Sequence, residues 1–181
     1  NHAEYVVVNQ NLCTRIPDNT DIKEASFTVL GSIALHGLRL SETSLGSKVV
    51  VIGLGIIGQL VCRLAEAQGS EVIGIDPDTK RTDLSANFYT SVEEANMTNV
   101  DSVIITAATS SNEPIEVATK IARNKAKIVV VGDIPLNISR NDFYYKELEL
   151  VVSKSYGPGR YDKQYEILGK DYPIEYVRWT E

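Results

Sequence analysis

Cysteine and histidine are scarce in this sequence of 181 residues, which contains two of each. Cys13 and Cys62 are far apart, and they form no zinc-binding motif with the two histidines. Cys13 lies in a polar segment and is predicted to be a free thiol, whereas Cys62 falls within a helical pattern and is predicted to be a core residue. The sequence therefore predicts no metal site in this chain, and its low cysteine content is typical of the reducing cytoplasm.

Long apolar runs and basic runs are also missing. No apolar stretch reaches the roughly 18 residues of a membrane-spanning helix, and no segment has the pattern of a secretory signal peptide. We therefore expect no membrane partner. The formal net charge is −6, and no basic run is longer than the pair Lys80-Arg81. This charge pattern argues against a nucleic-acid partner.

Apolar runs alternate with helical patterns along the middle of the chain. The predicted strands are residues 48–52, 71–75, 101–105, 126–131 and 148–152. The predicted helices are residues 56–68, 78–86, 91–98, 112–123 and 138–146. This alternation indicates an α/β fold, a doubly wound and mostly parallel sheet with helices on both faces. The hydrophobic content of 43% is sufficient for the core of such a domain.

The two ends of the chain depart from this alternation. Residues 4–8 predict a strand, which would need partner strands. Asp21 is placed to cap a helix over residues 22–40, with Glu24 in the position of a capping box. From residue 153 the alternation stops, and the glycines and proline within residues 155–161 predict a loop.

The most specific motif is a glycine turn at residues 53–58, between a predicted strand and a predicted helix. Its sequence is Gly53-Leu54-Gly55-Ile56-Ile57-Gly58. In this setting the G-x-G-x-x-G spacing is typical of dinucleotide binding. The first glycine allows a tight turn, the second lets a pyrophosphate approach the backbone, and the third lets the helix pack closely on the sheet. The N–H groups at the helix N-terminus would bind the phosphates, and the absence of a following lysine excludes a P-loop.

An acidic residue follows the glycine turn at the expected distance. Asp76 comes directly after the predicted strand 71–75 and lies 18 residues after Gly58, close to the ~20 residues typical of the carboxylate that binds a ribose 2′-hydroxyl. Because such a carboxylate repels the 2′-phosphate of NADP, the sequence favours NAD as the cofactor. Arg81 is close enough to weaken this preference, so NADP stays an alternative. The competing interpretation of Asp76 is a structural role at the start of the next helix.

Two further loops should lie beside the same cofactor, because ligands of such sheets bind outside the carboxyl ends of the strands. Thr106, Ala107 and Ala108 follow the third predicted strand, and Gly132 and Asp133 follow the fourth. The small side chains would permit close approach of a ribose. The alternative is that small residues simply end these two strands.

The order of these segments resembles the medium-chain dehydrogenase/reductase superfamily, which includes the zinc-type alcohol and threonine dehydrogenases. The N-terminal segments that support the resemblance are His2-Ala3-Glu4-Tyr5, Ile16-Pro17-Asp18 and residues 46–55. Residues 146–150, 155–162 and 171–181 are similar to bi-domain oxidoreductases associated with bacterial surface-polysaccharide synthesis. The resemblance covers nearly the whole chain and implies a Rossmann fold.

The resemblance implies that the chain is incomplete and has three parts. Residues 1–45 would be a remnant of a GroES-like catalytic domain with its connecting helix, residues 46–155 the dinucleotide-binding domain, and residues 156–181 a tail or linker. Members that use zinc hold it mainly in the catalytic domain. Thr28 falls where alcohol dehydrogenases place a later cysteine ligand, and threonine is a poor zinc ligand. Zinc is therefore expected only in the missing domain, if the parent protein uses it.

The resemblance also implies roles for particular residues. In that superfamily the positions of Ala107, Ala108 and Gly132 line the nicotinamide side of the cofactor, and backbone groups at residues 153–156 meet the carboxamide. The last strand, here residues 148–152, often pairs with its copy in a second subunit, which implies a homodimer. The alternative is that the tail at residues 172–179 covers this edge.

Taken together, these features predict the cofactor-binding domain of an NAD(P)-dependent oxidoreductase. The reaction would be hydride transfer between nicotinamide and an alcohol or carbonyl, with an alcohol or sugar-like substrate in the full protein. No catalytic residue can be named, since His36 is predicted to be structural and Tyr156 has no obvious partner except Lys154. The chain alone is expected to bind NAD without catalysis. A regulatory NAD-binding module is the alternative, and the intact glycine spacing argues against a methyltransferase.

Overall fold

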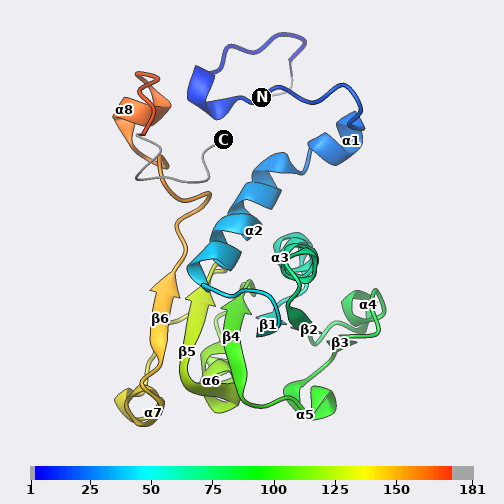
Figure 1. The fold of residues 1–181 in the computed structure, drawn as a ribbon, viewed down its shortest axis with the longest axis vertical. Helices are drawn as coiled ribbons and strands as arrows, with labels where there is room; N and C mark the ends of the chain where they lie inside the picture. Colours follow the sequence, from blue (N-terminus) through cyan, green and yellow to red (C-terminus); the bar gives the residue numbers. More distant parts are fainter. Residues whose placement is uncertain (1–2, 173–181) are drawn as a thin grey trace.

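A six-stranded, all-parallel sheet forms the centre of the molecule (Figure 1). The structure is a computed structural model that describes residues 3–172. Its strands are β1 (Lys48–Ile52), β2 (Glu71–Ile75), β3 (Phe88–Tyr89), β4 (Val100–Ile105), β5 (Ala122–Val130) and β6 (Glu149–Val152). They are ordered β3-β2-β1-β4-β5-β6, which is the order of dinucleotide-binding Rossmann folds. The predicted fold class is therefore confirmed.

Helices connect the strands and extend the molecule at both ends. They are η1 (Gln10–Leu12), α1 (Ile22–Ala25), α2 (Thr28–Leu40), α3 (Ile56–Ala67), α4 (Thr79–Thr82), α5 (Val92–Ala95), α6 (Glu113–Ile121), α7 (Arg140–Lys146) and α8 (Lys163–Glu166). The N-terminal segment and α8 lie side by side beyond the sheet (Figure 1), where the Asn11 side chain donates a hydrogen bond to the carbonyl oxygen of Tyr165.

The sheet separates two hydrophobic cores, because successive side chains of a strand point to opposite faces. On one face, Val49 and Val51 of β1 pack with residues of α2 and α3, including the buried Cys62. On the other face, Val50 and Ile52 pack with residues of α5 and α6. Helices therefore cover both faces, as predicted. Burial raises the pKa of the Cys62 thiol to about 12, which fits a core residue, whereas Cys13 is exposed.

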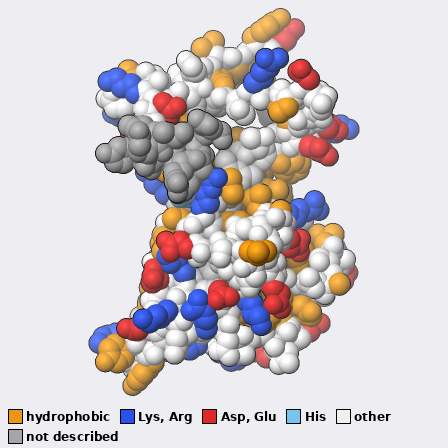
Figure 2. All heavy atoms as spheres, in the orientation of Figure 1, with side chains coloured by type: hydrophobic (Ala, Val, Ile, Leu, Met, Phe, Trp, Pro, Cys, Tyr) orange, Lys and Arg blue, Asp and Glu red, His pale blue; other side chains and the backbone are white. Residues whose placement is uncertain are grey.

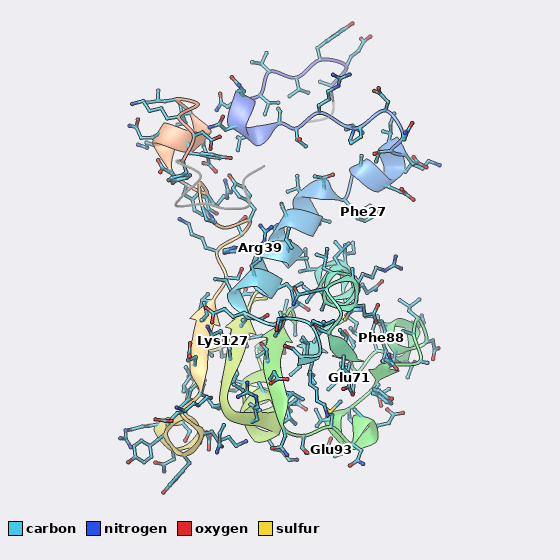
Figure 3. The ribbon with its side chains drawn as sticks, viewed as in Figure 1. Phe27, Arg39, Glu71, Phe88, Glu93 and Lys127 are labelled. Atoms are coloured by element: carbon cyan, nitrogen blue, oxygen red, sulfur yellow. The ribbon has the colours of Figure 1, made fainter. Side chains whose placement is uncertain are left out.

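Helix α2 lies across one face of the sheet and extends beyond the carboxyl ends of β5 and β6 (Figure 1). A Cβ on Gly37 would lie 2.6 Å from Val131 Cγ2, so the helix lies directly on the end of β5. Earlier in β5, Lys127 forms salt bridges with Glu42, which follows α2, at 2.8 Å and with Glu149 of β6 at 3.2 Å (Figure 3). These contacts fix α2 relative to the last two strands.

Two predictions for the N-terminal segment need correction. Residues 4–8 form no strand in the described part of the chain, and Tyr5 and Val7 are exposed, because no neighbouring strand offers hydrogen-bonding groups to them. The helix predicted over residues 22–40 is interrupted near Phe27 (Figure 3). There the hydroxyl groups of Ser26 and Thr28 donate to backbone carbonyl oxygens three residues earlier, which competes with continuous helix. The predicted cap is confirmed, since Asp21 accepts a hydrogen bond from the Lys23 N–H.

The remaining differences concern the boundaries of short elements. The two-residue strand β3 was not predicted, and Phe88 from this strand packs over Gly74 of β2 (Figure 3). The predicted helix 78–86 shortens to α4, and the predicted helix 91–98 shortens to α5, which ends at the left-handed Asn96 (φ 47°). Strand β5 begins at Ala122 rather than residue 126 and joins β4 with a shift in register.

The surface has no single dominant charge on the face in Figure 2. Lysine and arginine side chains are interspersed there with aspartate and glutamate side chains. None of the helices within residues 3–172 has the length and hydropathy to cross a membrane.

Candidate functional site

The glycine turn connects β1 to α3 at the carboxyl edge of the sheet. Gly53 has a φ of +97°, a left-handed conformation, and a Cβ there would lie 2.6 Å from the backbone nitrogen of Ala107. A Cβ on Gly58 would overlap the carbonyl oxygen of Gly53, so the first turn of α3 packs directly on the end of β1. Steric contacts within the protein therefore require glycine at both positions.

Gly55 differs from the other two glycines of the turn. None of the described atoms, apart from its chain neighbours, lies within 4 Å of the position that its Cβ would occupy. Its φ of −64° and ψ of −175° are accessible to any residue. Packing and backbone strain within the protein thus do not require glycine here. The space beside Gly55 is available to a ligand.

The N-terminus of α3 faces the same space. Gly55 is the N-cap and supplies no side-chain hydrogen bond, and the first helical bond runs from the Gln59 N–H to the Gly55 carbonyl oxygen. The N–H groups of Ile56, Ile57 and Gly58 therefore have no acceptor within the helix. Together with the positive end of the helix dipole, they form an arrangement suited to a phosphate.

Asp76 follows β2 and is bonded to the glycine turn. Its side chain is only 4% exposed. Oδ2 accepts a hydrogen bond from the Leu54 N–H at 2.7 Å, and Oδ1 accepts one from the Asp78 N–H at 2.9 Å. The guanidinium of Arg81 lies 3.0 Å from Oδ2. Burial alone would raise the pKa of Asp76, but these two N–H groups and Arg81 hold it below its usual value.

The predicted loop after β4 contacts the glycine turn, and the predicted loop after β5 contacts the loop after β4. The hydroxyl of Thr106 donates to the carbonyl oxygen of Gly53. A Cβ on Gly132 would overlap the carbonyl oxygen of Ala107, so the loops after β4 and β5 pack against each other. The Asp133 carbonyl oxygen accepts a hydrogen bond from the Thr109 N–H at 3.0 Å.

The structure therefore brings all the predicted site residues together at the carboxyl ends of four strands. They are Gly53, Leu54, Gly55, Ile56, Ile57, Gly58, Asp76, Arg81, Thr106, Ala107, Ala108, Gly132 and Asp133. Ala108 and Asp133 are exposed, whereas the side chain of Leu54 is fully buried and its N–H is used by Asp76.

Sequence reasoning missed one supporting residue, Gln59, and did not foresee the bond made by Thr109, which belongs to the predicted loop after β4. The side-chain amide of Gln59 donates to the Leu54 carbonyl oxygen at 2.9 Å, and Thr109 joins the two small-residue loops through its bond to Asp133. Gln59 directly follows the motif, so its position was the available signal. From the sequence, Arg81 was expected only to lie near Asp76, and the ion pair between their side chains was not predicted.

Neither residue considered for catalysis forms an acid–base site with its neighbours. The Tyr156 hydroxyl donates to Glu166 at 2.6 Å, and burial followed by this bond raises the pKa of Tyr156 to about 12. His36 is buried in α2, and burial followed by the charge of Arg39 lowers its pKa. His36 is therefore neutral near pH 7.

Residues 28–143 match the family described as D-isomer specific 2-hydroxyacid dehydrogenase, NAD binding domain. The chain belongs to this family of NAD-binding domains. The matched residues include β1 to β5, the glycine turn, Asp76 and both small-residue loops. The cofactor class predicted from the sequence is thereby confirmed.

Individual relatives are medium-chain dehydrogenases of alcohols and sugars, as the sequence predicted. The 2-dehydro-3-deoxy-L-galactonate 5-dehydrogenase of Pseudoalteromonas atlantica is 28% identical over 174 residues, which cover 85% of this chain and 49% of the relative. A zinc-binding dehydrogenase of Sinorhizobium meliloti bound to NADP has a TM-score of 0.68 and 26% identity, over 76% of this chain and 46% of that chain. Galactitol-1-phosphate dehydrogenase of Escherichia coli has a TM-score of 0.72 and 24% identity, over 84% of this chain and 49% of that chain.

The chain thus spans about half the length of these three proteins. The family description names hydroxy acids, whereas two of the relatives are named for sugar derivatives. What these proteins share is an NAD(P)-binding domain of an oxidoreductase. The link to polysaccharide synthesis stays a prediction.

The residues present do not fit a zinc site. Thr28 is exposed at the start of α2, and its hydroxyl donates to the Ala25 carbonyl oxygen at 2.7 Å. Within the described ranges, no three histidine, cysteine, aspartate or glutamate side chains form a cluster that could hold a metal ion. No step of the account below therefore uses zinc.

Proposed function

We propose that this chain binds the dinucleotide for an NAD(P)-dependent oxidoreductase that transfers hydride between nicotinamide and an alcohol or carbonyl. The observation that supports the proposal most strongly is the open space at Gly55, next to the unbonded N–H groups of α3. A glycine that neither packing nor backbone strain explains is accounted for by a ligand that must approach the backbone.

The cofactor would extend along the carboxyl edge of the sheet. The pyrophosphate would lie at residues 55–58 and the adenosine ribose at Asp76. The nicotinamide would lie near residues 106–108 and 132–133, with its carboxamide at the backbone of residues 153–156. This direction follows the general rule for open α/β sheets.

NAD is proposed as the preferred cofactor, with NADP as an alternative. The carboxylate of Asp76 keeps a free lone pair on Oδ1, which suits a ribose hydroxyl. Arg81 partly neutralises the same carboxylate and is half-exposed, so it could also bind a 2′-phosphate.

The substrate class is proposed from the relatives. Two of them are named for anionic polyol derivatives, a deoxy sugar acid and a sugar-alcohol phosphate. Among residues 3–172, Tyr156 is bonded to Glu166 and no cluster of possible metal ligands forms, so no general acid or base is evident there. We therefore expect the chain alone to bind NAD without catalysis, with the catalytic groups supplied by a separate domain. The division at residues 45 and 155 and the cytoplasmic location are part of this proposal.

A homodimer through β6 is also part of the proposal. Within the described sheet β6 pairs only with β5, and Val152 is 57% exposed at this edge. An unpaired strand edge favours pairing with a second chain. The alternative, in which the tail covers the edge, concerns residues that lie, apart from Tyr172, outside the described range.

Calorimetric titration of the chain with NAD, NADP and S-adenosylmethionine tests the proposal. We expect NAD to bind with a Kd below about 1 mM, S-adenosylmethionine not to bind, and no alcohol oxidation by the chain alone. Failure of both dinucleotides to bind would contradict the proposal. NAD binding that changes the affinity for a partner protein, without chemistry in the full-length protein, would favour the regulatory module instead.

A further inference from the structure

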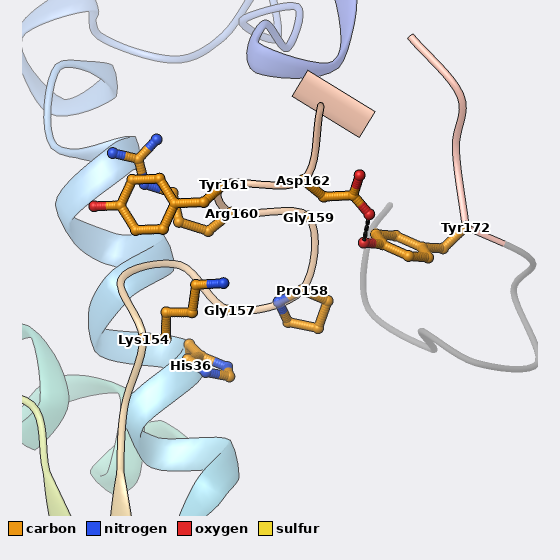
Figure 4. A pocket seen from close by; sticks show the side chains of 9 residues that line it. All are labelled: His36, Lys154, Gly157, Pro158, Gly159, Arg160, Tyr161, Asp162 and Tyr172. Atoms are coloured by element: carbon orange, nitrogen blue, oxygen red, sulfur yellow. Dashed lines mark hydrogen bonds between the residues drawn. The ribbon is translucent and has the colours of Figure 1, made fainter. Parts of the chain in front are cut away.

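A pocket of about 400 Å³ lies beyond the carboxyl end of β6, between α2 and the loop at residues 157–162 (Figure 4). We call it the loop pocket. Its lining includes the side chains of His36, Lys154, Arg160, Tyr161, Asp162 and Tyr172. It lies at the same edge of the sheet as the glycine turn. The proposed cofactor would place its nicotinamide end nearby, because that end is assigned to the loops after β4, β5 and β6.

The loop that forms the pocket has an unusual backbone. Ser155, Gly157, Gly159 and Tyr161 all have positive φ angles, of 50°, 95°, 88° and 64°. Two of the four are not glycine, and such conformations cost free energy unless the surrounding structure holds them. Gly157 is held against α2, since a Cβ there would overlap the imidazole of His36. The loop therefore packs on α2 with a backbone in the left-handed region at four positions.

Two cationic side chains, Lys154 and Arg160, line the pocket. Arg160 bonds to Glu166 at 2.9 Å and lies 3.9 Å from the ring centroid of Tyr161. Lys154 contacts the same ring at 5.3 Å, but it forms no salt bridge with any carboxylate of the described residues. Asp162 is the acidic group of the lining.

The carboxylate of Asp162 is already occupied. It accepts hydrogen bonds from the Tyr172 hydroxyl at 2.5 Å, drawn in Figure 4, and from the Gln164 N–H at 2.8 Å. These bonds, with that of Tyr172 first, and the positive charge of Lys154 hold the pKa of Asp162 below its usual value. Lys154 therefore lies near an acidic side chain but forms no salt bridge with it.

Two buried polar atoms of the lining also have no partner. Nδ1 of His36 and Nε of Arg160 are buried without a hydrogen bond among residues 3–172. His36 as a whole is 9% exposed. Buried nitrogen atoms without partners are uncommon in folded proteins, and each requires an explanation such as a bound water or ion.

We propose that the loop pocket binds the anionic group, a carboxylate or a phosphate, of a polyol substrate. Lys154 supplies a positive charge that no salt bridge uses, and Arg160 supplies further donors held in place by Glu166. The inference rests on the proposed function, because a substrate anion here would place the rest of a polyol next to the nicotinamide end of the cofactor site. Residues of this chain would thus recognise the anionic group of the substrate.

The test is an NMR titration of the full 181-residue chain with three probes at constant ionic strength. They are gluconate, sorbitol 6-phosphate and neutral sorbitol. We expect saturable shifts of the Gly157 and Gly159 amides with at least one anion, and binding of sorbitol at least about tenfold weaker. The anion that binds more tightly identifies the carboxylate or the phosphate as the recognised group.

Two variants make the test specific. Lys154→Gln should weaken binding of the anion about tenfold or more, whereas Lys163→Gln, an exposed lysine of α8 outside the pocket, should leave it unchanged. Equal affinity for sorbitol and both anions, equal effects of the two variants, or no saturable shift would each overturn the inference. NAD titrations of the same samples separate the two proposals. Retained NAD binding without anion binding contradicts only the loop-pocket inference, and loss of both contradicts the proposed function.

Discussion

The backbone N–H of Leu54 donates a hydrogen bond to Oδ2 of Asp76 over 2.7 Å, which joins the glycine turn to the end of β2. The carboxylate thus has a structural role before any ligand binds. Its second oxygen, Oδ1, accepts one hydrogen bond, from the Asp78 N–H, and can accept another. The structural and the ribose-binding interpretations of Asp76 are therefore compatible, because the bond that fixes the turn uses Oδ2 and leaves an acceptor lone pair on Oδ1.

Replacing Asp76 with asparagine should destabilise the fold. The substitution removes the charge that Arg81 pairs with and weakens the acceptor for the buried Leu54 N–H, which should lower the free energy of unfolding by about 1–3 kcal/mol. Urea denaturation measures this change. Asp83→Asn is the control, since Asp83 is exposed and should have little effect. Equal stability of the two variants would show that the Leu54–Asp76 bond contributes nothing measurable.

The same carboxylate should make stability depend on pH in acid. The pKa of Asp76 is lower in the folded protein than in the unfolded chain, so its contribution is fully present above the ordinary aspartate pKa of about 4. It is lost as the pH falls through the folded-state pKa. The wild-type protein should therefore lose more unfolding free energy than Asp76→Asn between pH 5 and pH 2, roughly the window in which an aspartate titrates. Parallel curves for the two proteins would contradict this assignment.

Glycine-to-alanine substitutions should separate packing from helix propensity. Gly58→Ala should cost about 1–3 kcal/mol, because the new Cβ would overlap the Gly53 carbonyl oxygen. Gly31→Ala in α2 meets nothing within 4 Å among the described residues and should stabilise by up to about 1 kcal/mol. Thermal unfolding of both variants measures the contrast. A stabilising Gly58→Ala would mean that α3 does not approach β1 as closely as described.

Arg81 should influence the choice between NAD and NADP. With Arg81→Gln, the Asp76 carboxylate loses its partner at 3.0 Å and repels a 2′-phosphate more strongly. We expect the ratio of the Kd for NADP to the Kd for NAD to rise about tenfold. Lys80→Gln, which removes an adjacent exposed charge, is the control. An unchanged ratio in Arg81→Gln would place Arg81 outside the cofactor site.

The strands that pair with another strand on each side were the part of the fold that the sequence predicted best. Residues 48–52 and 71–75 match β1 and β2, because continuous apolar runs are needed where both faces of a sheet are buried. The glycine turn was predictable from its spacing, in which Gly53 and Gly58 meet steric demands of the protein and Gly55 leaves space for a ligand. Residues 4–8 have the same apolar pattern as a strand but lack a partner, and a pattern alone cannot supply one.

Contacts between distant residues were not predictable. His36 and Gly157 touch only because α2 extends past β6, and no local pattern indicates this. The two-residue strand β3 depends on its pairing with β2 rather than on its own sequence. The helix breaks at Phe27 because neighbouring side-chain hydroxyl groups form hydrogen bonds to the backbone. Helix propensity alone would predict a continuous helix here.

The most direct test of the account is calorimetric titration of NAD into the wild-type chain and Gly55→Ala. The added methyl group meets no described atom and needs no change of φ or ψ, so the unfolding free energies should agree within about 0.5 kcal/mol. In the complex the same methyl group would occupy the approach of the pyrophosphate, and the Kd for NAD should rise about tenfold or more. Equal NAD affinity in two equally stable proteins would contradict the claim that the cofactor binds at the glycine turn.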